Sequence, residues 1–100
     1  MPKLKPIDRD EQRARREEVA RKAEAGELIL PEGIREMRRA LGMTQARFAT
    51  AFGLTRGQVI ELEAGRANPT LETLNRIGRP FGFRAGFIRG TAPYPEKPGS

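Results

Sequence analysis

The fold of this chain is decided by residues 41–74, which read LGMTQARFATAFGLTRGQVIELEAGRANPTLETL. Threonine is typical of the residue before a helix, because its hydroxyl accepts a backbone N–H of the first turn. Here this position recurs at Thr44, Thr55 and Thr70. Glycine is typical of the residue after a helix, and it stands at positions 42, 53 and 65. The spacing predicts helices over 45–52, 56–64 and about 71–79.

The two helices on either side of Gly53 have the residues that a helix-turn-helix requires. Ala49 is a small side chain where the helices approach closely, and Gly53 allows the turn dihedral angles that other residues avoid. The apolar side chains that would hold the second helix at its angle are Phe48, Phe52, Leu54, Val59 and Leu62. Such a pair presents its second helix outward, where it can dock in the DNA major groove.

Two more helices are expected before this stretch. Asp8 followed by Glu11 is typical of a helix start, and residues 9–25 are good helix formers. Pro31 suits the first position of a helix, and apolar residues repeat at helical spacing as far as Leu41. Residues 27–30 between them form a short, mostly apolar segment.

The pattern changes after Pro80, which should end the last helix because proline has no backbone N–H to donate. Apolar residues then alternate at Phe81, Phe83, Ala85 and Phe87. Alternation places these side chains on one face of an extended segment, so we expect a strand over 82–88.

Charge and composition divide the chain into three parts. We expect an N-terminal arm and charged helix over 1–30, a folded domain over 31–90 and a disordered tail over 91–100, which is rich in proline. The net charge is +6, and residues 31–90 carry ten arginines and no lysine against five acidic side chains. The planar guanidinium of arginine suits phosphates and the guanine edge.

Composition also excludes several functions. The chain has no cysteine and no histidine, which removes disulfides, thiolate nucleophiles, Cys/His zinc sites and the usual general base near neutral pH. No glycine-rich phosphate loop follows a strand. We therefore expect no enzyme, no metal site and no cofactor. No apolar run is long enough to span a membrane, and residues 1–26 lack the apolar core of a signal peptide, so we expect a cytoplasmic protein.

Residues 31–79 resemble the helix-turn-helix of the XRE/Cro family of phage-repressor-like regulators. The resemblance rests on Thr44-Gln45, Ala49, Gly53, Leu62-Glu63-x-Gly65-Arg66 and Asn68-Pro69-Thr70-Leu71 at these spacings. It implies a mainly α, lambda-repressor-like helix-turn-helix bundle, here with an additional N-terminal helix and a short C-terminal β-strand.

The resemblance implies DNA-binding roles residue by residue. Phosphate contacts fall to Gln45, Thr55, Arg66 and Arg47. Base-reading positions fall to Arg56, Gly57, Gln58 and Glu61. Arginine can bond guanine, glutamine can pair with adenine, and a carboxylate can accept from the cytosine amine. The family's buried ion pair corresponds to Arg38 and Glu63, which would have a structural role.

The sequence departs from the XRE/Cro pattern after Pro80, where the family commonly has a fifth helix. Residues 82–88 instead resemble the C-terminal strand of HipB-like antitoxins, which pairs across the two-fold axis of a dimer. This implies a homodimer whose interface holds Phe83, Arg84, Ala85 and Phe87, with both phenylalanines buried against the helical body. The alternatives are a strand paired with residues 27–30 of the same chain, or a tail folded onto the core.

These observations predict a sequence-specific DNA-binding transcriptional regulator, most simply a repressor that binds double-stranded DNA as a dimer on a palindromic operator. The alternative is an antitoxin that binds a toxin protein and autoregulates its operon. In that case residues 1–30 and 91–100 would hold the toxin.

Overall fold

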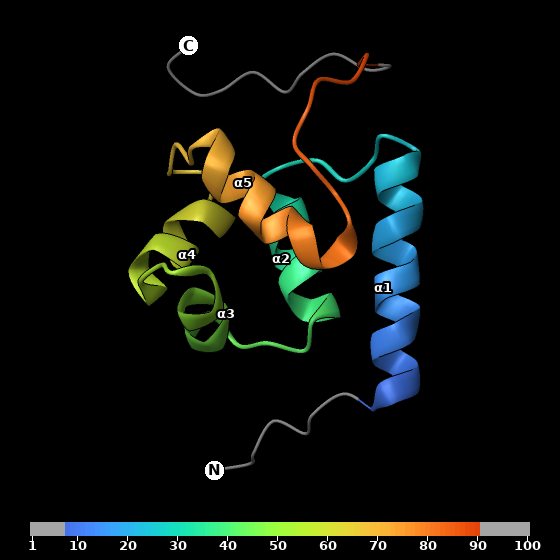
Figure 1. Ribbon diagram of the computed structural model, residues 1–100, viewed down its shortest axis with the longest axis horizontal. Coiled ribbons are helices and arrows are strands. Elements are labelled where there is room, and N and C mark those ends of the chain that lie inside the picture. The colour runs from blue at the N-terminus through green and yellow to red at the C-terminus, as the bar shows by residue number, and fades with distance from the viewer. Residues whose placement is uncertain (1–7, 91–100) are drawn as a thin grey trace.

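The computed structural model describes residues 8–90, and they form five α-helices and one 3-10 turn (Figure 1). In chain order these elements are α1 (Arg9–Glu24), α2 (Glu32–Ala40), α3 (Gln45–Phe52), α4 (Arg56–Glu63), α5 (Leu71–Gly78) and the 3-10 turn η1 (Arg79–Phe81). The mainly α fold is confirmed. The expected arm over 1–7 and the expected tail over 91–100 lie outside the described residues.

Local hydrogen bonds explain where the helices begin. The side chains of four residues each accept the backbone N–H three residues on, and these residues are Asp8, Thr44, Thr55 and Thr70. Pro31 differs from its expected place, because it precedes α2 as its N-cap and the helix begins at Glu32.

The core lies between α2, α3, α4 and α5, and α1 adds one residue to it. Its buried apolar side chains are Val19, Ile34, Met37, Ala40, Phe48, Ala49, Phe52, Val59, Leu62 and Ile77. The rings of Phe48 and Phe52 lie 4.6 Å apart between centroids. Four of the five apolar residues expected to hold the helix-turn-helix are buried, and Leu54 packs half-buried against the same core.

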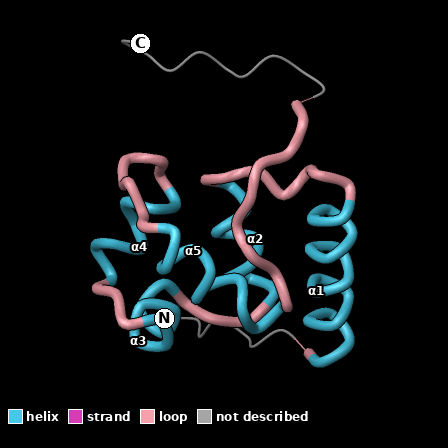
Figure 2. Tube along the Cα trace, turned by 45° about the horizontal axis from the view of Figure 1, so that its top comes forward, coloured by secondary structure: helices cyan, strands magenta, loops and turns pink. Residues whose placement is uncertain are grey.

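The additional helix α1 stands beside α2, on the side of the molecule away from α4 (Figures 1 and 2). Val19 is its buried residue. Lys22 of α1 forms an ion pair with Glu36 of α2. The rest of its length is mostly charged and exposed, so α1 is held by one apolar contact region and one ion pair. Among residues 8–90, no helix has the length and apolar character needed to cross a membrane.

The expected strand over 82–88 is wrong for the single chain. Residues 8–90 contain no strand, and residues 83–90 follow the 3-10 turn as a loop that passes the loop before α2 (Figure 2). A strand needs a neighbour for its backbone groups. Here the Phe83 N–H donates to the Gly78 carbonyl (3.0 Å) and the Ala85 N–H donates to Asn75 Oδ1 (2.8 Å). The start of the segment is therefore tied to α5, as in the folded-tail alternative.

Of the two phenylalanines expected to be buried after Pro80, one is half-buried and the other is exposed. Phe83 packs half-buried against the core and stacks on Phe81 with 5.2 Å between ring centroids. Phe87 is fully exposed, and its expected burial within one chain is wrong. The alternation that aligned these side chains requires a regular strand, which this segment does not form.

Candidate nucleic-acid interface

The turn between α3 and α4 fixes how α4 is presented. Gly53 ends α3 with φ +69°, a left-handed conformation that favours glycine. The Leu54 N–H donates to the Ala49 carbonyl over 2.8 Å, and Arg76 Nη1 donates to the Phe52 carbonyl over 3.2 Å. Val59 and Leu62 anchor the inner side of α4 in the core. The opposite side of α4 is left facing outward.

The first turn of α4 carries three of the four candidate base-reading residues. Arg56, Gly57 and Gln58 are all exposed. Arg56 is not joined by a side-chain hydrogen bond or ion pair to any other residue in the part of the chain that the structure describes, so its guanidinium is unengaged there. A Cβ built on Gly57 would meet only Thr55 Oγ1, at 3.8 Å, so packing does not require glycine there. The turn thus presents one long cationic side chain beside an open stretch of backbone.

Gln58 has a second role that the base-reading prediction did not include. Its Oε1 accepts the Thr55 backbone N–H (2.8 Å), while Thr55 Oγ1 accepts the Gln58 backbone N–H (3.0 Å). This reciprocal capping box satisfies two N–H groups at the start of α4. Pairing with adenine would need the Gln58 amide oxygen as an acceptor. In this structure that oxygen already accepts one bond, while the amide Nε2 has no partner among residues 8–90.

Glu61 and Arg66 form an ion pair that was not expected from the sequence. Arg66 Nε donates to Glu61 Oε2 (2.9 Å), and Arg66 Nη2 donates to Glu61 Oε1 (3.1 Å). The hydrogen bonds from Arg66 lower the pKa of the Glu61 carboxyl below its ordinary value, and those to Glu61 raise the pKa of Arg66. A base-reading candidate and a phosphate-binding candidate are therefore already bonded to each other.

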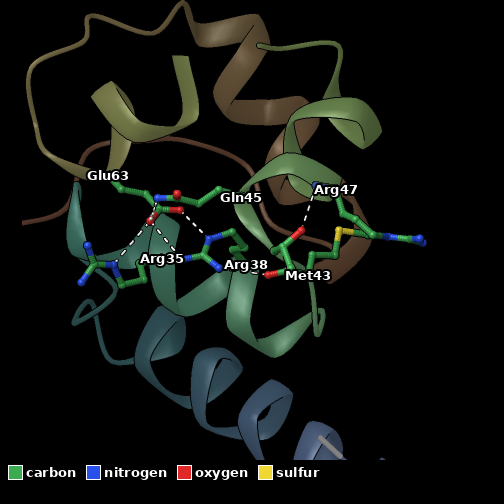
Figure 3. Close-up of polar contacts among 7 residues, drawn as sticks. Arg35, Arg38, Met43, Gln45, Arg47 and Glu63 are labelled. Atoms are coloured by element: carbon green, nitrogen blue, oxygen red, sulfur yellow. Dashed lines mark hydrogen bonds and ion pairs between the residues drawn. The ribbon is translucent and has the colours of Figure 1, made fainter. Parts of the chain in front are cut away.

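Glu63 is a buried carboxylate at the end of α4, with only 1% of its side chain exposed. Arg38 of α2 donates to both its oxygens, from Nε to Oε2 (2.6 Å) and from Nη2 to Oε1 (3.1 Å). Arg38 Nη1 also donates to the Met43 carbonyl (3.0 Å), which ties the pair to the loop before α3. The structure thus brings together the two residues that the family resemblance pairs (Figure 3).

Two further side chains reach Glu63 Oε1 (Figure 3). Arg35 Nε lies at 3.4 Å, and Gln45 Nε2 lies at 3.3 Å. Burial raises the pKa of the Glu63 carboxyl, but the hydrogen bonds from Arg38, then Gln45, outweigh it and hold the pKa below the ordinary value. Sequence reasoning missed the link between Gln45 and Glu63, because residues 18 positions apart have no common sequence pattern.

The other phosphate candidates lie around the start of α3. Gln45 is the first residue of that helix, and Arg47 follows on its exposed side. Arg47 donates its backbone N–H to Thr44 Oγ1 (3.1 Å), and its side chain extends past Met43 (Figure 3). These groups and the N–H groups of the first α3 turn could hold an anion.

The candidate dimerisation residues lie on another side of the bundle. Phe83 is half-buried, while Arg84, Ala85 and Phe87 are exposed. They border an apolar groove of about 610 Å³ whose other lining includes Leu28, Ile29, Leu30, Leu74 and Ile88. No three acidic side chains between residues 8 and 90 gather into a cluster that could hold a metal ion.

Comparison with known proteins places this geometry in a family. Residues 34–87 match the family model described as Helix-turn-helix (HTH_3). An uncharacterized HTH-type transcriptional regulator of Methanothermobacter thermautotrophicus is 47% identical over 49 residues, which is 49% of this chain and 71% of that protein. A protein of the same description from Archaeoglobus fulgidus is 41% identical over 51 residues, 51% of this chain and 73% of that one. No solved structure matches.

The matched residues include α3, α4 and the turn between them, so the comparison and the geometry concern the same part of the molecule. The chain belongs to the XRE/Cro-type helix-turn-helix family, a non-enzymatic family of DNA-binding transcriptional regulators.

Proposed function

We propose that this protein is a sequence-specific regulator that places α4 in the major groove of double-stranded DNA. The observation that carries the proposal is the exposed first turn of α4, where the guanidinium of Arg56 has no partner among residues 8–90. It stands on a helix whose other side is anchored by buried Val59 and Leu62. A rigid helix with an unengaged arginine at its start is suited to direct reading of base edges.

The contacts divide into those that read bases and those that bind the backbone. Arg56 donates to the O6 and N7 acceptors of guanine, and Gln58 donates from Nε2 to a groove acceptor while its oxygen stays in the capping box. Gly57 lets the DNA approach the backbone closely. Gln45, Thr55, Arg47 and Arg66 bind phosphates, which give affinity but carry no sequence information.

Selection of bound sequences from a random DNA pool tests the proposal. The unaltered chain should enrich one motif that contains guanine. Arg56→Ala should weaken binding to that motif by about 1–3 kcal/mol, roughly 5- to 150-fold, and relax the preference at the guanine position. Arg16→Ala on α1 is the matched control, because it removes an exposed arginine far from α4. Equal affinity of the unaltered chain for the motif and for random DNA would refute sequence-specific binding.

We also propose that the protein acts as a dimer and represses by occupying a palindromic operator. The support is an exposed apolar surface. Phe87 projects fully exposed beside the groove of about 610 Å³, and Ile29, Leu30 and Ile88 on the groove are each about half exposed. In a two-fold dimer the same surface serves both copies, so each Phe87 enters the partner's groove. Two recognition helices about 34 Å apart would then meet successive major grooves.

Light scattering after size exclusion tests the dimer. The unaltered chain should elute as a dimer at micromolar concentration, and Phe87→Ser should shift it to the monomer. Leu71→Ser is the matched control, since Leu71 is also exposed but does not line the groove. A monomeric unaltered chain would contradict the proposal. The antitoxin alternative stays a prediction, which a toxin gene beside this one would favour.

A further inference from the structure

Helix α4 ends in a backbone arrangement that turns Arg66 back toward Glu61. The Arg66 N–H donates to the Glu61 carbonyl (2.9 Å), and the Gly65 N–H donates to the Leu62 carbonyl (3.2 Å). Gly65 between them is left-handed, with φ +76°. These bonds define a Schellman motif, in which the residue after the glycine lies over the third-last residue of the helix. An apolar contact commonly joins those two positions, and here an ion pair does so.

The side-chain contact uses one edge of the arginine fork and leaves the other open. Nε–H and one Nη2–H bond the two carboxylate oxygens of Glu61. A guanidinium has five N–H donors, so the second Nη2–H and both Nη1–H groups stay available, and one from each nitrogen lies on the end-on edge. Arg66 is 62% exposed along its side chain and Glu61 is 46% exposed, so the pair lies at the surface.

We propose that Glu61 is a positioning residue that holds Arg66 for a DNA phosphate, and not a base reader. The proposal rests on the proposed DNA binding. Both Glu61 oxygens accept bonds from Arg66, so a contact with a cytosine amine would have to share the carboxylate with Arg66 or break the pair. Arginine loses much rotamer freedom when it is fixed at a phosphate. A partner that fixes it beforehand lowers that cost, and the end-on edge can bond two phosphate oxygens.

The pair is not needed to form the end of α4. The two backbone bonds and the left-handed Gly65 terminate the helix without either side chain. Exposed ion pairs also contribute little to folding stability. Variants at Glu61 should therefore fold, so an effect on DNA binding can be separated from an effect on the fold.

The test measures binding by fluorescence anisotropy, on the selected site and on versions with each base pair changed. Glu61→Ala should weaken binding about three- to tenfold, equally on every version. In the Arg66→Ala background the same change should not weaken binding, because nothing remains to position. Glu18→Ala is the control: it removes one negative charge and one arginine pair on α1, distant from α4.

Three results would overturn the proposal. In the first, Glu61→Ala changes the preference at one base pair, as loss of a base reader would. In the second, Glu61→Ala weakens binding as much in the Arg66→Ala background as in the unaltered chain, and in the third it tightens binding of the otherwise unaltered chain. A DNA-free measurement separates these from a failure of the proposed function. The Nε–H of Arg66 should exchange with water more slowly in the unaltered chain than in Glu61→Ala. Equal exchange rates would show that Glu61 does not hold Arg66, even if the chain binds DNA. Slow exchange in a chain that binds no DNA would refute the proposed DNA binding and leave the ion pair standing.

Discussion

Replacing Arg38 by methionine should destabilise the fold strongly. Methionine keeps an unbranched chain of similar volume but has no donor, so Glu63 loses the bond that Arg38 donates to each of its two oxygens. Its carboxylate stays almost fully buried, with 1% of the side chain exposed. Removing one partner of a buried ion pair costs about 3–5 kcal/mol, because the remaining charge has lost both water and its counter-charge.

The structure places the expected loss at the low end of that range, at about 3 kcal/mol. Arg35 and Gln45 still lie near Glu63 Oε1, at 3.4 and 3.3 Å, so they continue to donate to the carboxylate when Arg38 is absent. Urea denaturation followed by circular dichroism at pH 7 measures the loss. In a thermal scan it corresponds to a fall in Tm of about 12–24 °C for a domain of this size.

A second variant is needed, because a domain with a total stability of about 5–15 kcal/mol could unfold completely when Arg38 alone is replaced. Arg38→Met combined with Glu63→Leu removes both charges and should regain most of the stability, because apolar residues of similar volume replace buried ion pairs well. A loss below about 1 kcal/mol for Arg38→Met, or a double variant as unstable as the sum of its parts, would refute the reasoning.

Three further predictions concern other parts of the molecule. Gln45→Ala should weaken binding to specific and random DNA by the same factor in a gel-shift series, because it removes a phosphate contact; a change in sequence preference would contradict this. Gly78→Ala should destabilise the fold by about 1–3 kcal/mol in urea, since its Cβ would lie 2.8 Å from the Phe83 carbonyl oxygen; unchanged stability would count against this packing. Because the pKa of Glu63 is lower in the folded chain than in the unfolded chain, its ionised carboxylate stabilises the fold. This stabilisation is complete above the ordinary glutamate pKa and is lost as the pH falls through the lowered pKa of the folded chain. The urea midpoint should therefore fall less steeply with acid for Glu63→Gln than for the unaltered chain.

The parts of the fold that sequence reasoning predicted depend on local interactions. A threonine cap bonds a backbone group three residues away, and a left-handed glycine acts within one turn, so Thr44, Thr55 and Gly53 indicate helix ends without knowledge of the fold. The apolar spacing of α3 and α4 has the same local character. The resemblance added the pairing of Arg38 with Glu63, which spans 25 positions and has no local signature.

The features that were missed or wrong depend on distant partners. Alternating apolar residues over 82–88 describe a surface that a neighbouring strand would complete, but they do not supply the neighbour. The backbone of this segment is instead held by Gly78 and Asn75 of α5. The contact of Glu61 with Arg66 is short in sequence yet does not follow helical spacing, because the chain reverses at Gly65 between them. A carboxylate at the third-last residue of a helix, with glycine four residues and arginine five residues further on, is the signal that would have predicted it.

Glu63 connects the stability of the bundle to its DNA-binding side. Its carboxylate binds Arg38 of α2 and the amide of Gln45, the first residue of α3. One Nε2 hydrogen of Gln45 is directed to Glu63, which fixes the orientation of the amide and leaves the second hydrogen for another acceptor. A phosphate at the start of α3 would therefore meet a donor that is already oriented. The buried ion pair that stabilises the fold thus also sets the geometry of a proposed phosphate contact, and loss of Glu63 should reduce both stability and DNA affinity, whereas loss of Gln45 should reduce mainly affinity.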